Sequence, residues 1–265
     1  MPLSRLSRIF GRKANPPPSI PDGMRVYAVG DVHGRDDLLG ELASRIEADL
    51  RGAPDEVITV FLGDYVDRGP HSASVIARLV EKRFPTPVRA LRGNHEEMLL
   101  QFLREPATLG EWRRYGGLET LHSYGVSVAA ALRGEGFDVA HEELVAALPE
   151  AHLNFLNSAE FSLAIGDYFF CHAGVRPEVP LTEQRPEDLL WIREGFLRFD
   201  RPFEKVVVHG HTPVGVPDVR PNRINIDTGA FATSVLTCVA LEGQERRFIS
   251  AVGARPQRRV EKMRI

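Results

Sequence analysis

Cysteine is scarce in this sequence, because Cys171 and Cys238 are the only 2 among 265 residues. Two isolated cysteines in a chain of this length do not make the dense disulfide framework of small secreted domains. Both lie within apolar runs, so we expect them to be small buried residues. The chain therefore has to be stabilised by a hydrophobic core, for which its length is ample.

The sequence also lacks long apolar runs and a strong excess of charge of one sign. No apolar stretch approaches the roughly 18 residues that a membrane helix needs, and the first apolar residues are interrupted by Ser and Arg. Lys and Arg number 33 against 36 Asp and Glu, so no global basic field indicates a nucleic-acid partner. We expect a cytoplasmic protein without a membrane span and without a nucleic-acid partner.

Composition divides the chain into three parts. Residues 1–23 include a proline-rich run at 15–19 and are predicted to be a flexible leader. Residues 24–254 are expected to form the folded domain, and residues 255–265 a basic tail. We interpret the basic residues at both ends as solvated charges rather than as a docking surface.

Within the domain, short apolar strands alternate with helical patterns. Residues 24–29, 57–62 and 88–91 are expected strands, and the segments after them carry apolar residues at helical spacing. This alternation predicts a βαβ architecture with parallel strands.

Residues 105–158 break this rhythm and are predicted to form a mostly helical cap inserted into the domain. The chain after the cap is richer in strands, beginning with a hairpin around Gly166 and Asp167. Strands are expected at 161–165, 168–171, 206–208, 224–226, 235–241 and 248–252.

Two motifs rich in acidic residues follow the first two expected strands. Residues 30–34 read Gly-Asp-Val-His-Gly, and residues 63–69 read Gly-Asp-Tyr-Val-Asp-Arg-Gly. Alternation along an extended segment is expected to point Asp31 and His33 the same way, with Asp64 coming from the neighbouring strand. Carboxylate and imidazole ligands on one face are the beginning of a metal site and indicate hydrolytic chemistry.

Four further motifs come at the ends of later strands. They are Arg-Gly-Asn-His-Glu at 92–96, Cys-His-Ala-Gly at 171–174, His-Gly-His-Thr-Pro at 209–213 and Asp-Thr-Gly at 227–229. Every one follows an expected strand, and open α/β sheets place their sites beyond the carboxyl ends of the strands. We therefore expect all six motifs to meet in one site.

In this order, the motifs resemble those of the calcineurin-like metallophosphoesterase superfamily, over roughly residues 24–252. Arg-Gly-Asn-His-Glu and Asp-Arg-Gly narrow the resemblance to the branch of bacterial and phage PPP-type serine/threonine protein phosphatases. That branch also contains the symmetrical bis(5'-nucleosyl)-tetraphosphatases. The resemblance implies an α/β fold, a four-layer α/β/β/α sandwich with two mixed β-sheets.

The resemblance also implies a site with two divalent metal ions. Asp31, His33 and Asp64 would hold the first ion, Asp64 would bridge to the second, and three more ligands would complete it: Asn94, His172 and His211. A shared carboxylate offsets the repulsion between two ions about 3.5–4 Å apart. Mixed nitrogen and oxygen ligands suit Mn, Fe or Zn better than Ca or Mg, and Mn²⁺ is the ion we expect first.

Three arginines and a His–Asp pair are the remaining candidates. Arg68 and Arg92 lie inside the metal motifs and can bind phosphate oxygens with two N–H groups. Arg193 resembles a third substrate arginine of the branch, although an ion pair with Glu194 or Asp188 is an alternative. By family likeness, His95 would protonate the leaving oxygen and Asp67 would orient its ring.

Several residues keep two interpretations at this point. His209 lies two residues before His211 and is interpreted as a neighbour of the ligands or as a residue lining the site. Asp227 could orient a ligand imidazole or form a turn. In the cap, the run Trp112, Arg113, Arg114 and Tyr115 could touch substrate, although packing within the cap is favoured for Trp112 and Tyr115.

These residues predict a two-metal phosphoesterase. The favoured activity is that of a protein phosphatase, in which a metal-bridging hydroxide releases phosphate from phosphoserine or phosphothreonine, with phosphotyrosine left open. The alternative is a symmetrical bis(5'-nucleosyl)-tetraphosphatase, which would share the core motifs. A non-catalytic scaffold is disfavoured because every expected ligand and His95 are present. The expected partner is a phosphorylated protein or a phosphorylated small molecule; the sequence does not name which, nor the oligomeric state.

Overall fold

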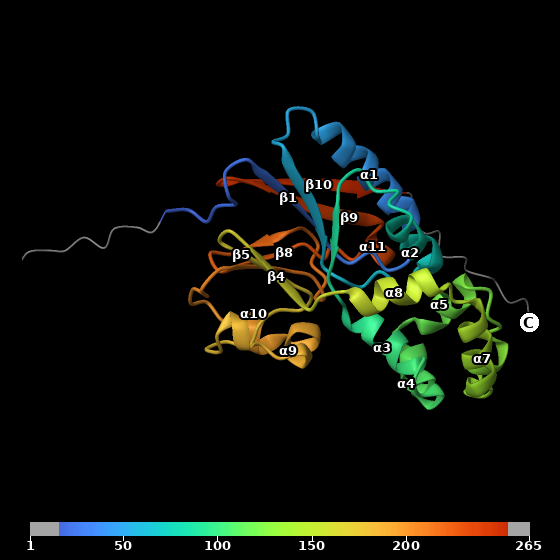
Figure 1. The fold of residues 1–265 in the computed structure, drawn as a ribbon. Helices are drawn as coiled ribbons and strands as arrows, with labels where there is room; N and C mark the ends of the chain where they lie inside the picture. The colour runs from blue at the N-terminus through green and yellow to red at the C-terminus, as the bar shows by residue number, and fades with distance from the viewer. Residues whose placement is uncertain (1–15, 254–265) are drawn as a thin grey trace, which may run out of the picture.

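The computed structural model describes residues 16–253 and confirms the predicted α/β fold with two mixed sheets (Figure 1). The first sheet has five strands in the order β10-β9-β1-β2-β3. Strands β1, β2 and β3 run parallel, and β9 runs antiparallel to both β1 and β10. The strands are β1 (Met24–Val29), β2 (Glu56–Phe61), β3 (Val88–Ala90), β9 (Val235–Glu242) and β10 (Glu245–Val252).

The second sheet also has five strands, in the order β4-β5-β6-β8-β7. Strands β5, β6 and β8 run parallel, whereas β4 and β7 are antiparallel edge strands. The strands are β4 (Ser162–Ile165), β5 (Tyr168–Cys171), β6 (Val206–His209), β7 (Asp218–Val219) and β8 (Arg223–Asn225). Strand β7 was not predicted, because two residues are too short to carry an alternating pattern.

The two sheets pack against each other through alternate residues of their strands. In β1, Val26 and Ala28 are buried in the core between the sheets, together with Phe170 and Val208 of the second sheet. Tyr27 and Val29 point to the other side of β1, into the core that the helices cover. Both faces of the strand are buried, and for this reason β1 reads as a continuous apolar run.

Helices cover the outer faces and complete four layers. Helices α1 (Asp36–Asp49) and α2 (Ser72–Val80) pack on the first sheet, where Leu38, Leu42 and Val75 are buried. On the second sheet lie α9 (Pro186–Trp191) and α10 (Glu194–Leu197), which bury Leu189 and Phe196. Two one-turn elements, η3 (Leu181–Glu183) and α11 (Ala230–Thr233), lie in the loops.

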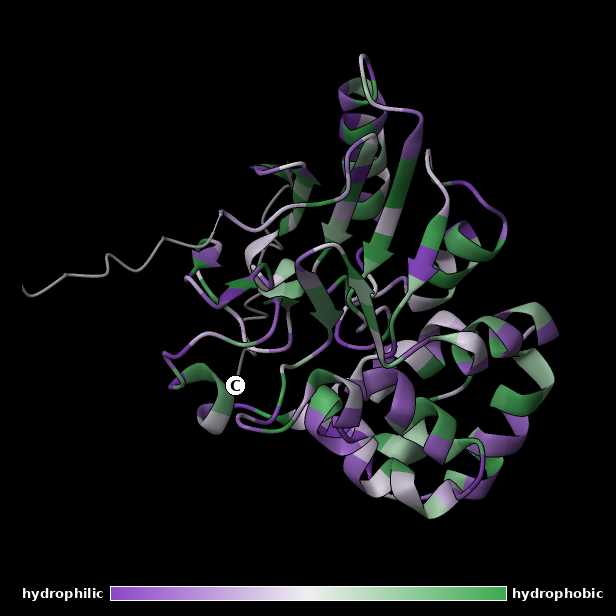
Figure 2. Cartoon of the chain, turned by 60° about the vertical axis from the view of Figure 1, so that its left-hand side comes forward, coloured by the Kyte–Doolittle hydropathy of each residue, from purple (hydrophilic) through white to green (hydrophobic). Residues whose placement is uncertain are grey.

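The segment predicted as a cap consists of helices and connecting turns. It follows α3 (Asn94–Phe102) and contains η1 (Pro106–Thr108), α4 (Leu109–Trp112), η2 (Arg113–Tyr115), α5 (Gly117–Ser123), α6 (Ala129–Leu132), α7 (Phe137–Ala147) and α8 (Glu150–Ser158). Figure 2 shows these helices as a separate lobe beside the strands, with hydrophilic and hydrophobic residues on each helix. Their apolar sides join the core of the first sheet, through Leu121 and Leu144 for example.

The packed part of the chain begins earlier than the predicted boundary at residue 23. Ile20 is 1% exposed within the core between the sheets, and its N–H donates to the Gly243 carbonyl oxygen at 2.9 Å. Residues 1–15 of the predicted leader and the predicted tail at 255–265 lie outside the described residues. Cys171 and Cys238 are buried free thiols, as expected. Among the helices of residues 16–253, none has the length and apolar character needed to cross a bilayer.

Candidate metal centre

The candidate ligands lie on loops that follow the carboxyl ends of parallel strands. Asp31 and His33 follow β1, Asp64 follows β2, and Asn94 begins α3 just after β3. His172 and His211 follow β5 and β6 of the second sheet. Because the parallel strands of each sheet end at the same edge, the six side chains converge although up to 180 residues separate them.

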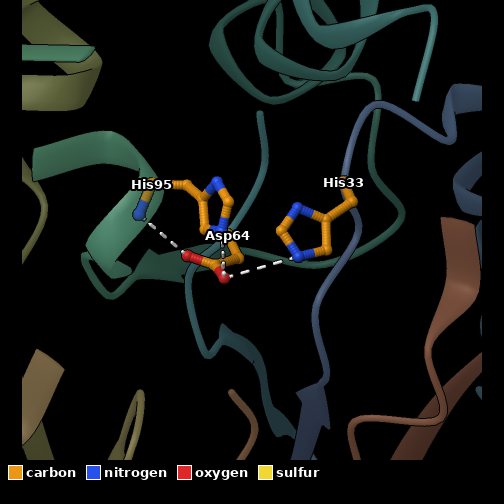
Figure 3. Close-up of side chains that lie close together, drawn as sticks. All are labelled: His33, Asp64 and His95. Atoms are coloured by element: carbon orange, nitrogen blue, oxygen red, sulfur yellow. Dashed lines mark hydrogen bonds and ion pairs between the residues drawn. The ribbon is translucent and has the colours of Figure 1, made fainter. Parts of the chain in front are cut away.

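The first group consists of His33, Asp64 and His95, whose ligand atoms all lie within 4.8 Å of one another (Figure 3). His33 Nε2 is 3.4 Å from Asp64 Oδ2, and His95 Nε2 is 3.7 Å from the same oxygen. The other His33 nitrogen, Nδ1, is 2.8 Å from the Val66 carbonyl oxygen. That carbonyl accepts a hydrogen bond from Nδ1–H, which leaves the lone pair of Nε2 free to bind a metal.

The second group consists of Asp64, His172 and His211, with Asn94 beside them. His172 Nε2 is 3.4 Å from Asp64 Oδ1 and 2.9 Å from Asn94 Oδ1. His211 Nδ1 is 2.9 Å from the same Asn94 oxygen. His172 Nδ1 is held by the Leu62 carbonyl oxygen at 3.0 Å, which again leaves Nε2 for the site. Asp64 therefore belongs to both groups.

Asp31 lies beside these groups and faces a third carboxylate. It accepts the backbone N–H of His211 at 3.1 Å. Burial raises the pKa of Asp31 well above its usual value, and the negative charges of Asp227 and Asp64 raise it further. Burial likewise raises the pKa of Asp227 to about 6. These three carboxylates need a source of positive charge close by.

The residues present fit two divalent cations that share Asp64. Burial raises the pKa of Asp64 well above its usual value, and the charge of Glu96 adds to this effect. Burial also keeps the imidazoles neutral, since it lowers the pKa of His172 to about 3 and that of His33 well below its usual value. The buried Nε2 atoms of His33 and His211 have no hydrogen-bond partner among the described residues. Neutral imidazoles with free nitrogen atoms among crowded carboxylates are a ligand set for a metal.

The backbone around the candidate ligands adopts a left-handed conformation that residues other than glycine rarely adopt. His33, Asp64, Asp67 and His211 have φ between 45° and 73°. The structure therefore corrects the expectation that alternation on an extended segment aligns Asp31 with His33, because β1 ends at Val29 and both residues lie in the loop that follows it. Left-handed backbone of this kind costs on the order of 1 kcal/mol or more per residue and clusters at functional sites.

Glu96 fixes the loop that carries Asp64, and the sequence interpretation gave this residue no role. Its buried carboxylate accepts N–H groups of Asp64 and Tyr65 at 2.8 Å, of Gly93 at 2.9 Å and of Val66 at 3.3 Å. Burial raises the pKa of Glu96 to about 7, whereas these four hydrogen bonds act to lower it. The only sequence signal for this role was the position of Glu96 at the third residue of a helix, where a capping glutamate is typical.

His95 and Asp67 form a buried pair at the edge of the first group. His95 Nδ1 is 2.6 Å from Asp67 Oδ2, and Arg68 Nη2 is 3.0 Å from His95 Nε2. Two cap residues also bind Asp67: Trp112 Nε1 donates to Oδ2 at 2.7 Å, and Thr120 Oγ1 donates to Oδ1 at 2.6 Å. Burial raises the pKa of Asp67 to about 7, and the hydrogen bonds from Thr120 and Trp112 hold it below the value that burial alone would give.

Arg68 and Arg193 supply positive charge near the ligands. The Arg68 guanidinium lies 4.8 Å from the centre of the Phe231 ring, and its charge lowers the pKa of His95, after the larger effect of burial. The charge of Arg193 contributes to the lowered pKa of His211, after burial and His172. Arg193 is not engaged by the carboxylates considered from the sequence, because Glu194 pairs with Arg198 and Asp188 pairs with Arg176.

The structure does not bring Arg92 to this cluster. Its Nη1 donates to Glu97 at 3.0 Å, and its Nη2 donates to the carbonyl oxygens of Leu156 and Asn157 at the end of α8. The guanidinium also lies 5.1 Å from the centre of the Phe161 ring. Arg92 therefore braces α8 against α3, and the sequence could not indicate this because α8 lies more than 60 residues away.

The structure shows the contacts of the residues that had two interpretations. His209 turns toward Phe196, with ring centres 4.9 Å apart, and does not join either ligand group. Asp227 accepts the Gly229 N–H at 2.9 Å, which is a turn contact, and its carboxylate faces Asp31. Trp112 is buried in the cap, as favoured. Tyr115 is not packed inside the cap, because it is 37% exposed beside His95.

Comparison with known proteins agrees with this geometry. The family model described as calcineurin-like phosphoesterase matches residues 24–232. The chain belongs to the calcineurin-like phosphoesterase family. The match contains all six candidate metal ligands, His95, Asp67 and the three arginines of the sequence interpretation.

Relatives within this family are named as tetraphosphatases, whereas the sequence analysis favoured a protein phosphatase. A Bacillus cereus (strain Q1) protein named asymmetrical bis(5'-nucleosyl)-tetraphosphatase PrpE is 26% identical over 254 residues, covering 88% of this chain and 96% of its own. A protein of the same name from Halalkalibacterium halodurans is 29% identical over 252 residues, again covering 88% of this chain and 96% of its own. The comparisons thus support the phosphoesterase family without singling out its protein phosphatase branch.

Solved structures support the fold of this calcineurin-like phosphoesterase. A putative diadenosine tetraphosphatase matches with a TM-score of 0.59 at 19% identity, covering 87% of this chain and 95% of its own. A cold-active protein tyrosine phosphatase from a psychrophilic Shewanella species matches with a TM-score of 0.54 at 17% identity, covering 88% of this chain and 83% of its own. At these identities the likeness concerns the fold alone.

Proposed function

We propose that this chain is a metal-dependent phosphoesterase that hydrolyses bis(5'-nucleosyl) tetraphosphates. One observation carries the phosphoesterase part: two groups of buried candidate ligands share Asp64, and His95 of the first group contacts both Asp67 and Arg68. The nucleotide part rests on the names of the relatives, which match the chain over 88% of its length. Neutral imidazoles and shared carboxylates of this kind are the ligands of two-metal hydrolases.

Asp31, His33 and Asp64 would hold one divalent ion, and Asp64, Asn94, His172 and His211 the other, as the family resemblance implies. When bound, two such ions supply positive charge for the phosphate oxygens and lower the pKa of bound water. Mn²⁺ is our first candidate, and the ligand chemistry also suits Fe and Zn.

Substrate binding and proton transfer would be carried out by side chains of the protein itself. Arg68 and Arg193 would bind and orient the phosphate oxygens. Their positive charge would stabilise the negative charge on these oxygens as the bond to the leaving group breaks. His95 would deliver a proton from Nε2 to the leaving oxygen, because Asp67 binds Nδ1, orients the ring and would stabilise its charged form. Burial of His95 and Asp67 excludes bulk water from this pair and strengthens the charge interaction between them.

A protein phosphatase is the second candidate, because the Arg-Gly-Asn-His-Glu and Asp-Arg-Gly motifs resemble that branch. A substrate panel separates the candidates. Purified protein loaded with Mn²⁺, Fe²⁺ or Zn²⁺ is assayed on diadenosine tetraphosphate, on phosphoserine and phosphothreonine peptides, and on a phosphotyrosine peptide. We expect the highest kcat/KM on diadenosine tetraphosphate, and a preference for a peptide would overturn the nucleotide assignment.

The reaction products show whether the tetraphosphate chain is cleaved asymmetrically or symmetrically. The relatives carry the label asymmetrical, so we expect AMP and ATP, whereas the symmetrical cleavage considered from the sequence yields two molecules of ADP. Chromatography of the nucleotides after partial hydrolysis distinguishes these outcomes. Asp64→Asn serves as the inactive control, and failure of every metal and substrate combination would refute the phosphoesterase proposal itself.

A further inference from the structure

Two large aromatic side chains are exposed beside the candidate metal centre. Tyr115 is 37% exposed and Trp191 is 41% exposed, whereas Trp112, the other tryptophan, is 1% exposed. They come from different parts of the fold, since Tyr115 ends η2 in the cap and Trp191 ends α9 on the second sheet. Exposed aromatic rings at a polar site are a typical contact surface for a ligand.

Both rings are positioned directly over the site. The Tyr115 ring lies 6.3 Å from the His95 ring, and the Trp191 ring lies 6.2 Å from the His211 ring, between centres. The two aromatic rings are 6.4 Å apart, with their planes inclined by 74°. They meet edge to face, so part of each ring stays open to solvent at the entrance of the cluster.

Positive charge accompanies the two rings. Arg193 follows Trp191 by two residues, and Arg114 directly precedes Tyr115. Both arginines are exposed, and within residues 16–253 neither forms an ion pair with a carboxylate. Aromatic rings together with unpaired guanidinium groups suit a ligand that carries both a flat ring and several phosphate charges.

A small cavity on the cap side of Trp191 adds polar groups to this surface. Its volume is about 90 Å³, and Gln101, Thr108 and Glu111 line it together with Trp191. These side chains offer both hydrogen-bond donors and acceptors at the edge of the indole ring. A heterocyclic base packed against Trp191 would thus be able to form hydrogen bonds with these polar side chains.

We propose that Tyr115 and Trp191 form a nucleobase-binding platform that places the adjoining phosphate chain of a dinucleoside polyphosphate over the metal centre. The inference deepens the proposed function and rests on it. A phosphoserine or phosphothreonine side chain has no ring for such a platform to bind. Stacking of one base on aromatic side chains changes affinity by roughly ten- to hundredfold, so the platform would dominate recognition of the nucleoside.

Fluorescence tests the platform without any catalytic turnover. The sequence contains only 2 tryptophans, and Trp112 is 1% exposed whereas Trp191 is 41% exposed. We expect AMP to quench the emission of the metal-free protein by contact with Trp191, and ribose 5-phosphate, which lacks the base, to leave it unquenched. Trp191→Phe should remove the AMP-dependent quenching. Equal quenching by ribose 5-phosphate, or full quenching in Trp191→Phe, would overturn the platform.

Kinetics provides the second test, with diadenosine tetraphosphate compared against a phosphopeptide that contains no aromatic residue. In Trp191→Ala and Tyr115→Ala, the ratio of kcat/KM for the nucleotide to that for the peptide should fall by about tenfold or more. Tyr115→Phe keeps the ring and should restore most of the ratio. Phe248→Ala removes an equally exposed ring from β10 and is the matched control that leaves the ratio unchanged.

The two tests separate the failure of the platform from the failure of the proposed function. If the protein hydrolyses diadenosine tetraphosphate and the alanine variants behave as Phe248→Ala does, the platform is refuted and the function stands. If AMP quenches Trp191 but diadenosine tetraphosphate is not hydrolysed, the proposed function is refuted and a nucleobase site stands. Quenching by a phosphotyrosine peptide and not by AMP would refute a nucleobase as the ligand of the platform. It would indicate that the platform binds the ring of phosphotyrosine instead.

Discussion

His95 and Asp67 are joined by a 2.6 Å hydrogen bond between Nδ1 and Oδ2, and both side chains are buried. Because Nδ1 donates its hydrogen bond to Asp67, Nε2 is the nitrogen that faces Asp64 and Arg68. The same carboxylate accepts hydrogen bonds from Trp112 and Thr120 of the cap. One buried carboxylate thus connects the imidazole of the candidate metal centre to the inserted helices.

Replacing Asp67 by Asn should lower kcat by about 10²–10⁴-fold, because a neutral amide neither stabilises a charged imidazole nor reliably accepts its Nδ1 proton. The measurement is kcat on the best substrate of the panel, with bound metal determined in parallel. Metal content should match that of the unaltered protein, since Asp67 belongs to neither ligand group. A kcat within threefold of the original would contradict a role for this pair in proton transfer.

The cap contacts to Asp67 predict a shift in the pH dependence. Thr120→Val and Trp112→Phe each remove a hydrogen bond that holds the Asp67 pKa down. The Asp67 pKa should then rise, less of the carboxylate is ionised at a given pH, and the acid limb of kcat/KM should move to higher pH. Ser123→Ala, on the same helix as Thr120, removes contacts to the Ala73 N–H and the Thr120 carbonyl but none to Asp67, and is the control with an unchanged profile. An unchanged acid limb in both cap variants would show that the cap only packs against Asp67.

The convergence of the candidate metal ligands could be predicted from the sequence because their signal is local. Each ligand directly follows an apolar run, and the carboxyl ends of parallel strands meet at one edge whatever the length of the connections. The strand pattern alone predicts parallel βαβ units, whereas the division into two mixed sheets was expected from the family resemblance. The local backbone geometry was not predicted, because His33 and Asp64 adopt left-handed backbone that no alternation pattern records.

Contacts between distant segments could not be predicted. Trp112 and Thr120 bind Asp67 across 45 and 53 residues, and nothing in their own surroundings marks them as partners of an acid. Arg92 lies inside a phosphoesterase motif, yet the packing of α8 determines where its guanidinium goes. A motif thus identifies which residues lie near the site, whereas the tertiary structure decides which of them face it.

Glu96→Gln should destabilise the protein by about 2 kcal/mol or more, because the amide turns an N–H₂ group toward backbone N–H donors and leaves buried groups unsatisfied. Urea unfolding of the metal-free protein measures this loss. Glu97→Gln is the matched control on the neighbouring residue: Glu97 is partly exposed and pairs with Arg92 and Arg104, so its loss should cost less than about 1 kcal/mol. Equal losses in the two variants would contradict the role of Glu96 in holding the Asp64 loop.

Metal should stabilise the protein more strongly as pH rises. The pKa values of Asp31 and Asp64 are raised above those of an unfolded chain, so in the metal-free protein these groups favour folding at low pH and lose that contribution as pH rises through their folded pKa values. Metal binding needs the ionised carboxylates and releases their protons. Ion at a hundredfold excess over its Kd adds about 2.7 kcal/mol, or roughly 5–10 °C in Tm.

The measurement for this prediction is Tm with Mn²⁺ and with a chelator, between pH 5 and pH 8. We expect the difference between the two Tm values to grow across this range and to vanish in Asp64→Asn. Asp218→Asn removes a carboxylate that pairs with Arg220 and Arg223 away from the cluster, and it should keep the full metal effect. A Tm difference independent of pH would mean that the carboxylates are already ionised before metal binds.

Inorganic phosphate should distinguish the arginines that face the site from the one that does not. Arg193→Ala removes an exposed guanidinium whose charge reaches His172 and His211, so the inhibition constant for phosphate should rise by about tenfold. Arg92→Ala breaks the contacts to Glu97 and α8, so it should lower the free energy of unfolding by about 1–3 kcal/mol and change phosphate inhibition by less than twofold. If Arg92→Ala instead weakens phosphate binding as much as Arg193→Ala does, then Arg92 must leave α8 during the reaction and act on substrate, as the motif alone predicts.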